Sequence, residues 1–254
     1  MKQNDFTVGS VPKAMLWFSV PFFLTNLIQS LYNIADIMIL SRYCGTDAIA
    51  GASIGGNITN TVTYMIIGLC NGGAILTAQY VGAKRGDDVK AVVSTTYTLM
   101  LLLSIVTTAV MLLCADPVLM ALNTPDEAFA ETKIYYNICM AGAIFVFGVN
   151  AGNSILRGLG DSKTPMYFGI GSCILNILLD LLFVGVLRMN IAGAALATII
   201  SQAAALFGSI VYLKTHDFVF DFRPQSFRLD SGKAAAIFRL GLPGAIQNMI
   251  VSGG

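Results

Sequence analysis

The sequence predicts an all-α integral membrane protein: a bundle of six transmembrane helices followed by the start of a seventh. Of the 254 residues, 56% are hydrophobic and 11% are charged, whereas a soluble domain carries about 25% charged residues. The apolar residues form six runs, each near the ~20 residues that a bilayer requires. Most charged residues fall between these runs, which is the pattern of a multi-pass membrane protein.

The six predicted spans cover residues 14–40, 49–81, 92–114, 134–156, 166–187 and 191–213. The second is the least regular, because glycine and asparagine interrupt it, and this favours close packing inside a bundle or a place along a cavity wall. We expect a transmembrane lobe over residues 1–213, an inter-lobe linker over 214–233, and the beginning of a second lobe over 234–254.

The expectation of a second lobe comes from a repeat. The segment Gly241–Ser252 aligns with Ser19–Ser30 through a shared proline, asparagine and serine. Six spans separate the two segments, so both would enter the membrane from the same side, as in a parallel repeat. The chain therefore resembles one half of a twelve-helix protein.

The loop charges predict an orientation. Twelve of the 15 Lys and Arg residues fall at the N-terminus, in the even-numbered loops or after span six, and only Arg42, Lys133 and Arg188 fall on the other side. The positive-inside rule then puts the N-terminus in the cytoplasm and the protein in the cytoplasmic (plasma) membrane. The net charge of +1 favours no nucleic-acid partner, and five dispersed cysteines with one histidine indicate neither a zinc site nor a disulfide framework.

Two acidic residues, Asp36 and Asp180, lie inside predicted spans. A carboxylate at membrane depth is costly unless it is paired, protonated or hydrated, so each marks a functional site. Asn176 lies one helical turn before Asp180. Helix rise puts Asp36 about 6 Å, and Asp180 and Thr198 about 10 Å, from the outer ends of their spans. Their oxygens suit Na⁺ or a shared proton. Asp36 could instead extend to the interface, Asp180 could make a structural hydrogen bond to a neighbouring helix, and Asn176 and Thr198 could be interhelical hydrogen-bond partners.

Further polar positions suggest a cavity. Gln29, Asn33 and Asp36 share a face of span one, with Tyr32 beside them. Asn150 and Asn153 stand together in span four, nearer the cytoplasmic side. Pro21 removes a backbone donor inside span one and predicts a kink, which is either static or a hinge.

On several of these segments the chain resembles the N-terminal lobe of multidrug and toxic compound extrusion (MATE) transporters, in the DinF-like prokaryotic branch. The segments are Arg157–Met166 with its RGxGDxKTPM pattern, Gln79–Ala83, Pro21–Asp36 and Asn176–Asp180. The resemblance implies an antiporter, not an enzyme, that exports amphipathic, often cationic compounds in exchange for Na⁺ or H⁺.

By that resemblance Asp36, Asn176, Asp180 and Thr198 match the cation or proton site, with Asn150 alongside. Gln29, Tyr32, Asn33 and Asn153 would line the substrate cavity. No cofactor is expected beyond the coupling ion. Family members have about twice this length, so the second lobe would be supplied in cis or by another chain.

Two alternatives stay open. A lipid-linked oligosaccharide flippase of related fold would favour a strongly basic cavity, and the predicted spans have no Lys or Arg at their centres. An inactive fragment that needs a partner lobe is the other. An intramembrane enzyme is disfavoured, because no nucleophile–base pair or metal-ligand spacing is present.

Overall fold

The computed structural model describes residues 11–215 and 218–253, and most of them are helical. The elements in chain order are α1 (Val11–Tyr43), α2 (Thr46–Gly82), α3 (Gly86–Leu113), α4 (Ala115–Ala121), α5 (Asp126–Ala141), α6 (Ala143–Gly158), α7 (Lys163–Asp180), the π-helix η1 (Leu181–Val186), α8 (Asn190–Thr215), the 3-10 turn η2 (Pro224–Ser226) and α9 (Ser231–Gly253).

The predicted six-span bundle is confirmed. Five described helices, one of them α7 with its π-helical extension, are long and apolar enough to cross a membrane, and α5 with α6 adds a sixth crossing if this bent pair counts as one span. The fourth span differs from the expectation in two respects. It begins at Asp126 rather than near Ile134, and it bends by 50° between Ala141 and Ala143. The intervening Gly142 has helix-breaking character, which accounts for the place of the bend.

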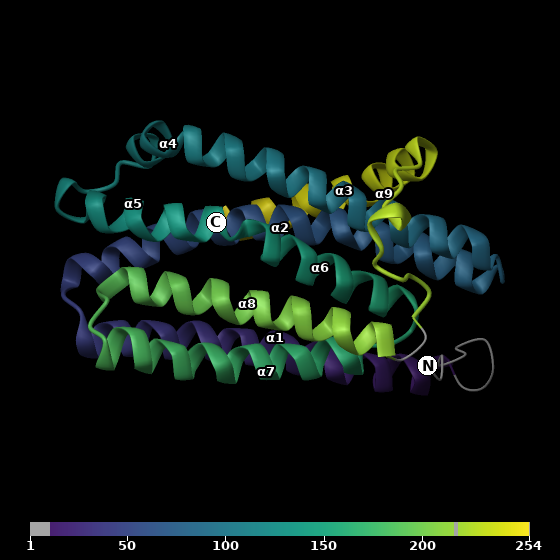
Figure 1. Cartoon of the computed structure of the whole chain (residues 1–254), viewed down its shortest axis with the longest axis horizontal. Coiled ribbons are helices and arrows are strands. Elements are labelled where there is room, and N and C mark those ends of the chain that lie inside the picture. Colours follow the sequence, from purple (N-terminus) through teal and green to yellow (C-terminus); the bar gives the residue numbers. More distant parts are fainter. Residues whose placement is uncertain (1–10, 216–217, 254) are drawn as a thin grey trace.

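Two groups of helices surround the long central helix α2 (Figure 1). On one side α1, α7 and α8 run side by side, and on the other α3 and α9 lie along α2. The bent pair α5–α6 joins the groups, because α5 and α6 each contact both α2 and α8. The main apolar core lies among α2, α3, α6 and α9, and includes the buried Ile66, Val92, Phe147 and Ile237.

The outer faces of the bundle carry many exposed apolar side chains. Val20, Phe23, Ile105, Leu178 and Phe207 are each more than half exposed. In water such a surface would be a large association patch, but hydrocarbon covers it at little cost, which agrees with a membrane protein.

The loop between α6 and α7 explains the local RGxGDxKTPM pattern in structural terms. Gly160 has φ 86°, a conformation that favours glycine. The Asp161 carboxylate accepts the backbone N–H groups of Lys163 and Thr164, both at 3.0 Å, and the Thr164 hydroxyl at 2.6 Å. These bonds satisfy donors at the start of α7 that lack partners within the helix.

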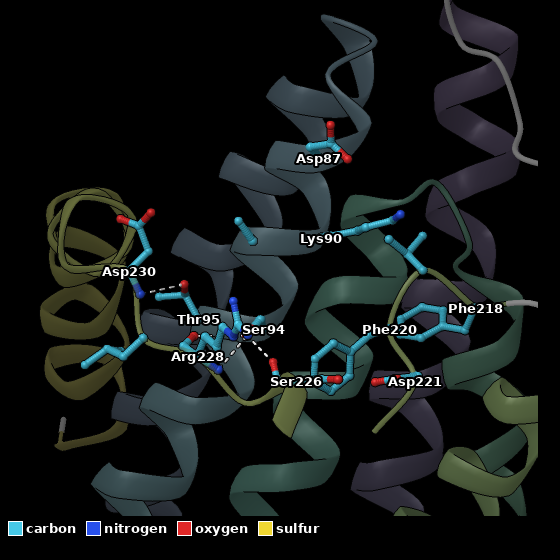
Figure 2. A pocket seen from close by; sticks show the side chains of 13 residues that line it. Asp87, Lys90, Ser94, Thr95, Phe218, Phe220, Asp221, Ser226, Arg228 and Asp230 are labelled. Carbon is cyan, nitrogen blue, oxygen red and sulfur yellow. Dashed lines mark hydrogen bonds between the residues drawn. The ribbon is translucent and has the colours of Figure 1, made fainter. Parts of the chain in front are cut away.

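The predicted linker is folded against the bundle rather than hanging free. The Ser94 hydroxyl on α3 donates to the carbonyl of Ser226 at 2.6 Å and accepts the N–H of Arg228 at 2.8 Å. Phe220 is buried and stacks on Tyr97, with ring centroids 5.7 Å apart. Figure 2 shows the linker crossing α3 at these bonds. The helix that follows the linker, α9, packs against α2.

Candidate functional site

The two intramembrane carboxylates meet in the structure. Asp36 lies on α1, Asp180 is the last residue of α7, and these helices pack side by side. The carboxyl groups lie within interaction distance of each other. The sequence placed them on separate helices at similar depth, and packing of α1 on α7 brings them together.

Asp180 and its neighbour Asn176 are enclosed and unsatisfied. Asp180 is 0% and Asn176 is 1% exposed. Both carboxylate oxygens of Asp180, both amide atoms of Asn176 and Oδ1 of Asp36 make no hydrogen bond with any group that the structure describes. Leaving a buried polar group without a partner costs about 1–3 kcal/mol, and more for a charge. These five unpartnered atoms make Asp36, Asn176 and Asp180 the candidate site for a cation or a proton.

Thr198 joins this cluster through Tyr32. The Tyr32 and Thr198 hydroxyl oxygens are 3.0 Å apart, which links α1 to α8. Tyr32 lies close enough to Asp36 and Asp180 for its hydroxyl to interact electrostatically with both carboxyl groups. Tyr32, assigned from the sequence to the cavity wall, therefore lies near the carboxylates and is hydrogen-bonded to Thr198.

The remaining predicted site residues lie apart from this contact. Asn150 is half-buried and donates its side-chain N–H to the Val146 carbonyl at 2.8 Å, within its own helix α6. Asn153, on the same helix, is also half-buried. In the described part of the chain neither forms a hydrogen bond with Asp36 or Asp180.

The polar face predicted on α1 is open. Gln29 and Asn33 are exposed, two turns and one turn, respectively, before the half-buried Asp36. Pro21 is buried, and α1 continues through it as a single helix. The Thr25 hydroxyl donates to the Pro21 carbonyl at 2.8 Å, one turn further along.

Sequence reasoning missed two features of the site. Tyr135 and Cys139, on α5, are buried and lie beside Asp36. Their spacing of four residues on an apolar helix is an ordinary core pattern, so no signal marked them. The second is the π-helix Leu181–Val186, which begins directly after Asp180. Such turns occur often at functional sites, and nothing in the apolar LLFVGV sequence distinguishes one from an α-turn.

The donor set suits a hard monovalent cation or a proton better than a transition metal. No group of three or more His, Cys, Asp or Glu residues that could hold a metal ion occurs among the described residues. Two carboxylates with an amide and hydroxyls provide oxygen ligands only. A hollow of about 700 Å³ between α3 and the linker is a separate feature (Figure 2), and no residue of the carboxylate cluster lines it.

Comparisons with known proteins agree on one family. The MatE family model matches residues 21–182. The chain is 34% identical over 257 residues to the probable multidrug resistance protein YpnP of Bacillus subtilis (strain 168), covering 100% of this chain and 57% of that protein. It is 27% identical to the multidrug export protein MepA of Staphylococcus aureus (strain bovine RF122 / ET3-1), covering 97% of this chain and 54% of that protein.

A solved structure agrees with the fold. The structure described as the outward-facing conformation of a multidrug resistance MATE family transporter of the MOP superfamily is 27% identical to this chain, with a TM-score of 0.90. The match covers 98% of this chain and 55% of that one. The chain thus spans about half the length of the relatives it matches. The family model, the relatives and the fold together show that this chain belongs to the MatE family of multi-pass membrane transporters and is not an enzyme.

Proposed function

We propose that this chain forms the ion-coupling lobe of a secondary active antiporter that exports amphipathic, often cationic compounds in exchange for Na⁺ or H⁺. The family supports transport, and the names of the relatives support multidrug export. The single observation that carries the coupling role is the unpartnered pair Asp36 and Asp180, with Asp180 fully enclosed.

The two carboxylates would make the conformation of the lobe depend on ion binding. Two adjacent carboxylates in an apolar bundle repel each other and lack solvation. A proton or a Na⁺ ion removes that cost, so its binding favours whichever conformation buries the pair. An ion can drive a conformational change only through such a difference in affinity between two states.

The polar residues around the pair have distinct roles. Asn176 and Asp180 supply amide and carboxylate oxygens from α7, and Asp36 supplies the carboxylate from α1. Tyr32 and Thr198 hold α1 against α8 beside the ion. Gln29, Asn33 and Asn153 extend from this point as a polar but uncharged path for the exported compound.

The arrangement of the whole transporter follows from the repeat. A second six-helix lobe, in cis or from another chain, would close the substrate path between the lobes. The N-terminus and the linker would lie in the cytoplasm, at the side where basic residues gather. Mass measurement of the protein isolated from its native membrane tests this: about 27 kDa means that the lobe needs a partner chain, and about twice that mass means that the second lobe is covalently attached.

The decisive experiment replaces Asp180 with Asn, which removes the charge and keeps the shape. The D180N protein should reach the membrane in normal amount but lose ion-driven drug export. The matched control is D47N, at an exposed carboxylate near the start of α2, and it should export normally. Full export by D180N would refute the proposal. Imposing a Na⁺ gradient or a pH gradient alone on vesicles then shows which ion drives export.

A further inference from the structure

The first helix of the second repeat is fastened to the lobe by a contact between backbones. Gly68 and Gly72 on α2, four residues apart, face Gly241 and Ala245 on α9, also four residues apart. A Cβ atom built on Gly241 would lie 2.8 Å from the Leu69 Cα, far inside ordinary contact. This is the small-residue geometry that lets membrane helices approach most closely.

The reverse direction of the contact is equally tight. A Cβ on Gly72 would lie 2.8 Å from the Gly241 nitrogen, and one on Gly68 would lie 2.8 Å from the Ala245 Cβ. No side chain therefore separates the two helices at this point. Ala245 and Gly241 are buried there, whereas the neighbouring Leu242 and Ile246 on α9 are about half exposed.

The crossing lies at the same level on both helices. Gly72 precedes the end of α2 by ten residues and Gly241 follows the start of α9 by ten residues, about 15 Å of helix in each case. The crossing is thus some way inside the bundle, with a stretch of each helix on either side.

On the Lys233 side of the crossing, polar contacts accompany the apolar packing of the buried Ile237. At the start of α9 the Lys233 ammonium pairs with the Asp88 carboxylate at 2.7 Å and lies 5.0 Å from the centre of the Tyr80 ring. The hydrogen bond to Asp88 raises the pKa of Lys233, so this cation stays charged at neutral pH. Past the crossing, the Asn248 amide donates to the Tyr64 carbonyl at 3.3 Å.

The linker adds breakable bonds at the same end as Lys233. The N–H of Asp230 donates to the Thr95 hydroxyl at 3.2 Å, close to the Ser94 bonds (Figure 2). Ser94 and Thr95 are buried, and the Lys233 and Asp88 side chains are only 14% and 24% exposed. These few polar contacts must open if α9 and the linker move away from α3 at this end. A backbone-to-backbone crossing has no interlocked side chains, so its angle can change without rotamers being forced apart.

We infer that the α2–α9 crossing is the fixed pivot between the two lobes, and that Asp88 and Lys233 form a latch which opens when the lobes rock about it. The inference rests on the proposed transport function for its purpose, but its geometry can be measured without transport. The crossing keeps its contact through the cycle, and displacement increases with distance from it along α9.

Two cysteine pairs, placed in the full-length gene product from which other cysteines have been removed, test the inference. The latch pair is Asp88→Cys with Lys233→Cys, joined by a short bis-methanethiosulfonate reagent whose two disulfides a reductant can break. The pivot pair is Tyr64→Cys with Asn248→Cys, joined by oxidation or by the same reagent. Both are assayed in native membrane vesicles, before and after reduction.

Linking the latch pair should stop export, and reduction should restore it; linking the pivot pair should leave export intact. The inference is overturned if both links stop export, if neither link stops it, or if only the pivot link stops it. The rate of linking is the second readout. Changing the Na⁺ concentration at constant pH should alter that rate for the latch pair and leave it constant for the pivot pair. A pH change is read as the ratio of the two rates, because pH alters the thiolate fraction of every cysteine.

This second readout separates the two proposals. If the unlinked proteins fail to export any drug but the linking rates behave as expected, the pivot is upheld and the proposed substrate is wrong. If export is normal but both rates respond alike to the ions, the transport function is upheld and the pivot is wrong. Expression level and linking yield, read from gels, show in each case that the variant has folded.

A glycine substitution gives an independent check. Gly72→Ala forces α9 away from α2 and should slow export while ion binding at Asp180 persists, because the cluster of Asp36 and Asp180 lies on other helices. Gly56→Ala is the matched control on the same helix, where a Cβ would meet nothing within 4 Å. Export by G72A at the wild-type rate would contradict the close crossing.

Discussion

Replacing Gly158 by alanine should destabilise the lobe, although alanine is the better helix former. Gly158 is the last residue of α6 and rests on the backbone of α2. A Cβ atom there would lie 2.6 Å from the Ala74 carbonyl oxygen and 2.9 Å from the Thr77 Cβ. Ordinary contacts of a methyl group are about 3.5–4.0 Å, so α6 and α2 must separate by roughly 1 Å.

Two opposed effects determine the magnitude. Overpacking of this kind costs about 1–3 kcal/mol, and a gap of up to 1 Å forfeits about a quarter to a half of each dispersion contact. The gain in helix propensity from glycine to alanine is about 1 kcal/mol. The net destabilisation is therefore up to about 2 kcal/mol, which in a chain of this size lowers Tm by up to roughly 8 °C.

The assay is thermal unfolding of the purified protein in detergent, with Gly171→Ala as the matched control. Gly171 is a helical glycine on α7 at which a Cβ would meet nothing within 4 Å, so that variant should be unchanged or up to about 4 °C more stable. Opposite signs for the two variants support the reasoning. Equal shifts, or a more stable G158A, would show that the α2–α6 contact yields without cost.

Three further expectations concern single contacts. Tyr32→Phe removes the hydroxyl 3.0 Å from the Thr198 hydroxyl and should lower the free energy of unfolding by about 0.5–1.5 kcal/mol. It should also reduce the rise in Tm that Na⁺ or low pH gives; an unchanged rise would remove Tyr32 from the site. Gly160→Ala imposes a Cβ on a backbone with φ 86° and should cost about 1–2 kcal/mol, whereas Gly86→Ala, in open space, should not lower Tm. Asp161→Ala should cost about 1 kcal/mol through loss of the bonds at the start of α7. Asp161→Asn keeps one oxygen that can accept both backbone N–H groups and loses only the acceptor for the Thr164 hydroxyl, so it should unfold close to the wild-type temperature. Equal losses would mean that charge rather than capping matters.

The two acidic residues of the candidate site could be predicted from the sequence because charged side chains are rare inside membrane spans. Acidic side chains inside an apolar run are so costly that Asp36 and Asp180 could be selected by composition alone. The number of spans follows from the length that a bilayer demands. The RGxGDxKTPM loop combined a glycine at positive φ with a capping aspartate, both of which are local effects and therefore legible in the sequence.

The sequence did not predict which side chains on different helices contact one another. Depth alone grouped Asp36, Asp180 and Thr198, but only packing shows that Thr198 bonds to Tyr32 near the carboxylates while Asn150 bonds within α6. Depth counts residues along one helix, whereas contact also depends on the rotation of each helix about its axis. A helix in lipid can be apolar all round, so periodicity gives no rotation.

The bend at Gly142 and the π-turn after Asp180 illustrate the same limit, since both change the direction of side chains without changing composition. The sequence by itself determined the membrane class, the six spans and the two intramembrane acidic residues, because each follows from the solvent that the chain must occupy. Tertiary structure alone decided which polar groups share a site and where α9 crosses α2. Those depend on close packing between segments far apart in the chain, and a single glycine or a single rotation of a helix is enough to change them.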